Sequence, residues 1–78
     1  MPMPRLIESH AELVESFNDA VAECGSAMLF ARPRQDDEPG AAYAAVGEYR
    51  WHLTQAVVDA VLAQGDPPAL AAKLGELG

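Results

Sequence analysis

The stretch that most constrains the fold is Ala41–Gln64, AAYAAVGEYRWHLTQAVVDAVLAQ, which lacks proline and holds both tyrosines and the only tryptophan. Its apolar residues recur at helical spacing. On a helical wheel, one face carries Val46, Leu53, Val57, Ala60 and Val61. A second apolar side, roughly 100° further round, carries Trp51, Val58 and Leu62. A helix with one neighbour needs an apolar stripe of about 100°, so we expect this helix to be covered from two sides.

The N-terminal part of the chain predicts another long helix. Its apolar stripe advances in steps of three and four and consists of Leu6, His10, Leu13, Val14, Phe17, Ala20, Val21 and Cys24. Two starts are compatible with the pattern: Pro4 as the first helical residue, which we prefer, or Ser9 as a cap with Glu12 completing a capping box. Met28 still fits the stripe, so we expect the helix to pass Gly25 and reach Phe30 or Ala31. The alternative is an end at Gly25 and a short strand at 27–32, which lacks a recognisable pairing partner in the sequence.

The remaining segments complete an all-α prediction. The charged, proline-flanked run RPRQDDEPG at 32–40 indicates a turn, with its acidic residues capping the next helix. Gly65 ends the second helix, and Asp66 and Pro67 begin a short third one whose apolar residues are Leu70, Leu74 and Leu77. We therefore expect one domain over 1–78, an antiparallel helical hairpin of two long helices plus a short C-terminal helix, with helices at about 5–30, 40–64 and 67–76.

The short chain needs support beyond its own core. A domain of 78 residues buries a small share of its surface and often depends on disulfides, a metal or a partner. Cys24 is the single cysteine, so an internal disulfide is excluded. We therefore predict a protein-interaction module without catalytic activity, acting as a homodimer or with a protein partner. Its predicted apolar partner-binding residues are Trp51, Val58 and Leu62.

The charge of the chain points in a second direction. Twelve acidic residues face five basic ones, for a net charge of −7, which argues against direct nucleic-acid binding. The acidic ridge of the first helix consists of Glu8, Glu12, Glu15, Asp19 and Glu23. It is either a solvated face or a docking surface for a basic partner. In the second case the protein is an acidic inhibitor, a phage-type antagonist that presents carboxylates to a nucleic-acid-binding protein.

Residues that could support catalysis or bind metal are sparse. Cys24 and His10 share a helical face but would lie about 21 Å apart, so we interpret Cys24 as a small buried apolar residue. His10 is more consistent with a hydrogen-bonded histidine than with a ligand. Glu48 and His52 are four residues apart, with Asp59 further along the same strip, and we interpret this strip as solvated. We expect no metal, no cofactor and no enzyme; the remaining alternative is a metal- or substrate-binding enzyme subunit assembled across chains.

Two further expectations concern location and an anomaly. The N-terminal residues lack the apolar centre of a signal peptide, and no run approaches the ~18–20 apolar residues of a membrane span. We therefore expect a cytoplasmic protein without membrane association, in agreement with its lone thiol. The anomaly is Arg50, which the wheel places within an apolar face. It either extends its guanidinium to the edge of that face or pairs at an interface.

Overall fold

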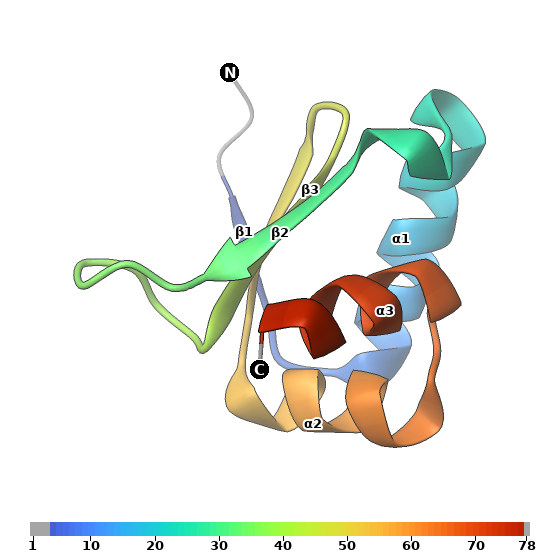
Figure 1. Cartoon of the computed structure of the whole chain (residues 1–78). Coiled ribbons are helices and arrows are strands. Elements are labelled where there is room, and N and C mark those ends of the chain that lie inside the picture. Colours follow the sequence, from blue (N-terminus) through green and yellow to red (C-terminus); the bar gives the residue numbers. More distant parts are fainter. Residues whose placement is uncertain (1–3, 78) are drawn as a thin grey trace.

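The computed structural model describes residues 4–77, which form a four-stranded sheet and three α-helices (Figure 1). Their order along the chain is β1 (Arg5–Ile7), α1 (His10–Cys24), a 3₁₀ turn (Ser26–Met28), β2 (Leu29–Pro33), β3 (Ala42–Val46), β4 (Tyr49–Leu53), α2 (Gln55–Gln64) and α3 (Pro68–Leu77). The predicted all-α helical hairpin is wrong, and the protein has an α+β fold.

The correction is largest in Ala41–Gln64, which divides into the β3–β4 hairpin and α2. In β4, apolar and polar residues alternate with the period of two that sends successive side chains to opposite faces of a sheet. Gly47 opens the two-residue connection between β3 and β4 with a φ of 57°, which glycine adopts without strain. The Thr54 side chain then accepts a hydrogen bond from the Val57 backbone N–H at 3.4 Å and caps α2.

The predicted helix at 5–30 is likewise shorter than expected. The Ser9 side chain caps α1 and accepts from the Glu12 backbone N–H at 3.5 Å, so the later of the two proposed starts is the correct one. Gly25 ends the helix, and the extension to Phe30 is wrong. The chain instead enters β2, close to the strand alternative at 27–32. The pairing partner that the sequence did not reveal is β3, which was hidden inside the presumed second helix.

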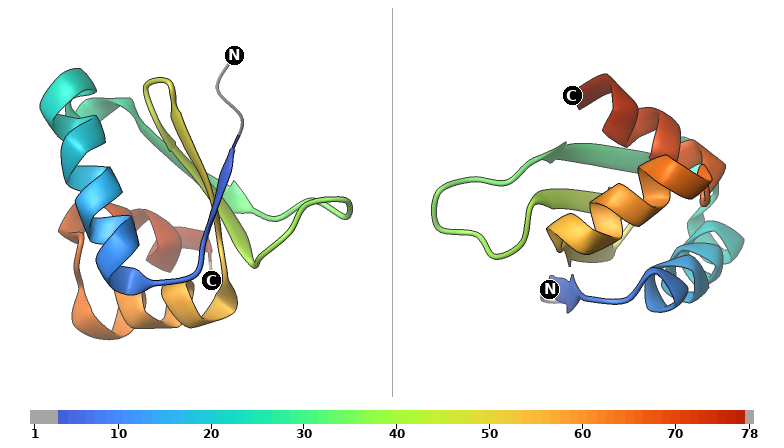
Figure 2. Two further views of the ribbon diagram at one scale, coloured as in Figure 1. Left: turned by 180° about the vertical axis from the view of Figure 1, so that it is seen from behind. Right: turned by 90° about the horizontal axis from the view of Figure 1, so that it is seen from below.

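The sheet has the strand order β1-β4-β3-β2. β2, β3 and β4 form an antiparallel meander, whereas β1 joins β4 in parallel, with Ile7 opposite Leu53. All three helices pack on one face of this sheet, and their buried residues form one core with those of the strands (Figures 1 and 2). Within that core the rings of Phe17 and Trp51 stack at a centroid distance of 6.3 Å.

The C-terminal part agrees best with the sequence prediction. Gly65 ends α2 in the left-handed conformation, as expected. α3 begins at Pro68, one residue after the predicted start, and buries Leu70 and Leu74. No helix within residues 4–77 combines the length and apolar character that crossing a membrane requires.

The arrangement leaves the second face of the sheet without a helix (Figure 2). We call this surface the open face. The strand registers place on it Leu6 of β1, Phe30 and Arg32 of β2, Tyr43 and Ala45 of β3, and Arg50 and His52 of β4. A sheet with one covered face is common among antiparallel folds, but the uncovered face is then usually polar. The mixture of aromatic, aliphatic and cationic residues here marks the open face as the candidate site.

Candidate functional site

Tyr43 lies at the centre of the open face and is only 7% exposed. Its ring is covered by neighbouring side chains. The Arg32 guanidinium carbon lies 4.2 Å above the ring centroid, a cation–π contact. The Phe30 and His52 rings approach it at centroid distances of 6.4 and 5.6 Å. These contacts fix the centre of the face as a rigid platform.

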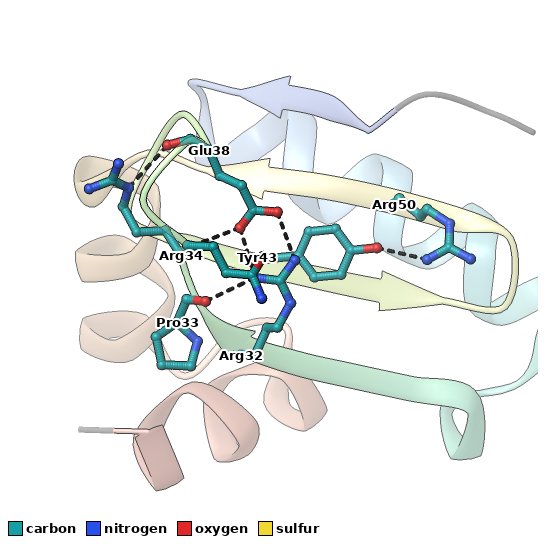
Figure 3. A network of polar contacts seen from close by, with 7 residues as sticks. Arg32, Pro33, Arg34, Glu38, Tyr43 and Arg50 are labelled. Carbon is teal, nitrogen blue, oxygen red and sulfur yellow. Dashed lines mark hydrogen bonds and ion pairs between the residues drawn. The ribbon is translucent and has the colours of Figure 1, made fainter.

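Glu38 brings the loop between β2 and β3 back onto this platform (Figure 3). Its carboxylate accepts two hydrogen bonds of 2.7 Å from the Arg32 guanidinium, a bidentate pair with defined geometry. The same carboxylate accepts a hydrogen bond from the Gln35 backbone N–H at 2.9 Å. Arg34 donates to the Glu38 backbone carbonyl at 3.0 Å. The loop is therefore ordered by polar contacts, and it orients Arg32 over Tyr43.

These donors make Glu38 unusually acidic. The Arg32 hydrogen bonds, followed by the Gln35 N–H, lower the pKa of Glu38 from 4.5 to about 2. A lowered folded-state pKa means that the pair stabilises the protein fully above pH ~4.5 and loses its effect as the pH falls towards 2. We expect carbon-13 NMR to show the Glu38 carboxyl titrating near pH 2. In the Glu38→Gln variant, the free energy of unfolding should fall less over this pH range than it does in the wild type. Asp37→Asn removes one charge from the same loop without touching Arg32 and is the control, and a midpoint near 4.5 would contradict the pairing.

Arg50 is the second cation of the open face, and it differs from Arg32 in its partners. Its guanidinium donates to the Tyr43 hydroxyl at 2.7 Å (Figure 3). Its Nε is buried and has no hydrogen-bond partner among the described residues. Within residues 4–77 no carboxylate lies within 4.0 Å of it. The strand also resolves the anomaly of the helical wheel, because Arg50 and Trp51 point to opposite faces of the sheet.

His52 provides another incompletely bonded group on the same strand. It is 9% exposed, and its Nδ1 is buried without a partner among the described residues. On either side of β3 and β4, the edge strands expose apolar side chains: Phe30 of β2 at 53% and Leu6 of β1 at 41%. The open face thus presents two exposed apolar groups around a cationic centre, a combination suited to binding another molecule.

The predicted apolar partner-binding residues are separated by the fold. Trp51 is 2% exposed in the core, where little of it remains for a partner. Val58 and Leu62 do lie together, in a groove of about 210 Å³. The other residues that line this groove are Pro33, Ala41, Ala42, Leu74 and Leu77. Leu74 and Leu77 of α3 therefore share this groove with Val58 and Leu62, whereas Trp51 does not line it.

The predicted acidic ridge is partly engaged within the chain. Glu8 precedes α1, whereas the other four residues lie on it. Glu12 pairs with Arg5 at 3.2 Å. Glu23 accepts a hydrogen bond of 2.7 Å from the Tyr49 hydroxyl, and this bond raises the pKa of Tyr49. Glu15 and Asp19 remain exposed.

A cleft of about 410 Å³ adjoins the ridge between α1 and β4. The residues that line it include three acidic ones, Asp19, Glu23 and Glu48, and the cationic Arg5. Arg50 also lines it, although its guanidinium bonds the Tyr43 hydroxyl on the opposite face of the sheet. Within the described part of the chain, no group of three His, Cys, Asp or Glu side chains is placed so that it could hold a metal ion.

The remaining reactive residues are far apart in the fold. Glu48 lies in the hairpin turn, His52 on the open face and Asp59 on α2, so the strip expected on one helix does not exist. Cys24 lies beside the β3–β4 turn, where a Cβ at Gly47 would stand 2.5 Å from its sulfur. His10 donates from Nε2 to the Asp66 carbonyl at 2.6 Å and ties α1 to the α2–α3 connection. This bond confirms the interpretation of His10 as a hydrogen-bonded histidine.

Phe30, Arg32, Glu38 and Tyr43 were not predicted from the sequence as a cluster, because Phe30 and Tyr43 lay in presumed helices and Arg32 and Glu38 in a presumed turn. A usable signal exists in YRWHL at 49–53, whose strict alternation predicts a half-buried strand. A strand there requires a partner, and AYAAV across the short Gly47–Glu48 connection is the nearest segment. No protein-family model, curated protein or solved structure is significantly similar to this chain.

Proposed function

We propose that this protein is a small protein-interaction module without catalytic activity, and that the open face is its docking surface. One observation carries the proposal: Phe30 and Leu6 are 53% and 41% exposed on either side of Arg50, a half-buried cation that pairs with no carboxylate of the described residues. Exposed aromatic and aliphatic groups beside an arginine are typical of binding hot spots. The occupant is either a second copy of the chain or another protein. We place this activity in the cytoplasm, where the Cys24 thiol stays reduced.

The test compares two substitutions of exposed apolar residues. Phe30→Asp introduces a charge on the open face, and Leu62→Asp introduces the same charge on α2, where Leu62 is 46% exposed. Both positions are solvent-accessible, so both variants should fold, which circular dichroism checks. We expect proteins cross-linked to the wild-type chain in lysate of the source cells to be lost at least tenfold with Phe30→Asp, because desolvating a buried aspartate opposes docking.

The control decides where the docking surface lies. Leu62→Asp should retain the cross-linked proteins, as measured by quantitative mass spectrometry. Equal recovery with Phe30→Asp and the wild-type chain would rule out the open face as the docking surface. Loss with Leu62→Asp alone would transfer the function to the groove that Val58 and Leu62 line.

A second candidate function is the acidic inhibitor, which the cleft between α1 and β4 favours. There the carboxylates of Asp19 and Glu23 from the ridge are joined by that of Glu48, so the anionic surface extends beyond one helix. Glu15→Lys with Asp19→Lys should weaken binding to a basic nucleic-acid-binding partner, and binding should fall steeply with salt. Phe30→Asp should leave this binding unchanged. Affinity that is insensitive to both lysines and salt would exclude this function.

A further inference from the structure

The open face holds a hydrogen-bonding deficit at Arg50. A guanidinium has five N–H donors, and among the described residues this one makes a single side-chain hydrogen bond, to the Tyr43 hydroxyl. Its buried Nε has no partner in the same part of the chain. The contrast with Arg32, which binds Glu38 through two bonds of 2.7 Å, shows what is missing. Partial burial of a cation is costly unless a carboxylate pairs with it. Because Nε is buried, an occupant of the open face would present that carboxylate to the terminal nitrogens of the guanidinium.

His52 places a second deficit beside the first. It lies two residues from Arg50 on the same strand, so the Cα atoms of the two residues are roughly 6.6–6.8 Å apart and their side chains share one face. Its Nδ1 is buried and has no partner within residues 4–77, and the side chain is 9% exposed. The two incompletely bonded groups of the open face are therefore neighbours in β4.

The exposed apolar groups define the length of that occupant. Leu6 and Phe30 lie on β1 and β2, the two edge strands of the order β1-β4-β3-β2. Three strand spacings, with the offset in register, put them roughly 14–16 Å apart, and Arg50 lies between them on β4. In an α-helix, positions i and i+11 are about 16.5 Å apart and point in nearly the same direction. Positions i+4 and i+7 fall between them on the same stripe.

A helix suits the face better than an added strand. Strand addition occurs at a sheet edge, where backbone N–H and C=O groups are free. The backbone groups of β3 and β4 are used on both sides by neighbouring strands. A helix satisfies its own backbone and presents side chains alone, and helices covering one face of a sheet are a standard layer arrangement.

A second copy of this chain is a poor occupant. Two-fold stacking of open faces would bring Arg32 and Arg50 of each copy towards those of the other. The carboxylate of Glu38, which the loop brings to this face, is already held by Arg32. The sheet also measures only about 19 by 17 Å, or roughly 320 Å², well below the ~800 Å² per partner of a standard interface. A charge-complementary helix needs no such symmetric match.

We propose that the open face binds an amphipathic helix of another protein, which pairs a carboxylate with Arg50 between two apolar residues that contact Leu6 and Phe30. This inference rests on the proposed function of the open face as a docking surface. The partner helix carries apolar residues at i and i+11 and aspartate or glutamate at i+4 or i+7. The small footprint implies a weak, reversible complex.

The experiment uses a displayed library of 18-residue helical peptides. The full chain is the target, and Phe30→Asp is the counter-target that removes peptides bound elsewhere. We expect the enriched peptides to share the apolar pair with an acidic residue between. For one synthetic peptide, Arg50→Gln should weaken binding at least tenfold, because a charged hydrogen bond is lost. Replacing the peptide's acid by its amide should have the same effect, without a further loss in combination. Lys73→Gln, at an exposed position of α3 on the other side of the sheet, is the control and should leave the affinity unchanged.

The outcomes separate this inference from the function on which it rests. Enriched peptides without an acidic residue, or equal affinity for the wild type and Arg50→Gln, would overturn the acidic helix while leaving the open face as a docking surface. A dimer in light scattering that Phe30→Asp dissociates would do the same in favour of self-association. If neither a peptide, a dimer nor a cross-linked protein depends on Phe30, both the inference and the proposed function are wrong.

Discussion

Replacement of Trp51 by alanine is expected to destabilise the protein by about 3–5 kcal/mol, the usual cost of removing a large aromatic side chain from a core. Trp51 is 2% exposed and stacks on Phe17 with the ring centroids 6.3 Å apart. A domain of 78 residues is stable by about 4–12 kcal/mol in total. The substitution therefore removes a large share of that stability, and urea unfolding followed by circular dichroism measures it.

The control for Trp51→Ala is an exposed apolar residue. Leu62→Ala removes a side chain that is 46% exposed on α2, and its effect should stay within about 0.5 kcal/mol, as for most surface positions. A helical hairpin with Trp51 on a partner surface makes the opposite prediction. There, Trp51→Ala would spare the unfolding of the monomer and abolish association, so this pair of variants tests the fold itself.

Local signals in the sequence predicted the helix ends better than the architecture. Gly65 was correctly placed at the end of α2, and Ser9 with Glu12 was recognised as a possible start of α1, although an earlier start was preferred. Both signals depend on a few neighbouring residues, whose capping chemistry is read directly from the sequence. The decision between helix and strand at 41–53 depends instead on pairing between segments, which local patterns determine poorly.

The error had a specific physical origin. Alanine-rich AYAAV has strong helix propensity, and the following residues can be drawn as a helix with two apolar sides. In the structure, alanines at positions 42 and 44 are 5% and 0% exposed, so they serve as small core residues beneath packed helices. Arg50 was the anomaly of the helical interpretation, because the wheel placed it within an apolar face. The strand places it instead on the open face, beside Tyr43.

The open face could not be predicted from the sequence alone, because it depends on the pairing of strands. Phe30, Tyr43 and Arg50 come from three strands and become neighbours only through the registers of β2, β3 and β4. Glu38 joins them across the loop, six residues from Arg32. The acidic ridge, by contrast, was visible because it lies along one helix. Sequence reasoning can thus propose a surface that one element carries, but it cannot assemble a surface that depends on strand pairing.

Gly40→Ala is expected to lower the free energy of unfolding by roughly 3 kcal/mol or more, because a conformational cost and a steric contact add. Gly40 has a φ of 81°, and a Cβ there would stand 2.6 Å from the Leu53 carbonyl oxygen. A left-handed conformation costs a residue with a side chain about 1–2 kcal/mol. The contact adds to this cost, because the same carbonyl accepts the 2.6 Å hydrogen bond from the Ala41 N–H that starts β3. Relief of the clash must therefore disturb the register of β3 against β4.

Two other glycines separate these mechanisms. Gly65 has a φ of 63° and open space around its Cβ position, so Gly65→Ala should show the conformational cost alone, about 1–2 kcal/mol. Gly75 lies in α3 with open space and a helical conformation, so Gly75→Ala should stabilise the protein by about 0.5–1 kcal/mol. Urea unfolding of the three variants should rank them in this order. The contrary result is that Gly40→Ala lowers the free energy of unfolding no more than Gly65→Ala does. That result would mean that the backbone at Gly40 does not lie against Leu53, and that the pairing of β3 with β4 is wrong at that end.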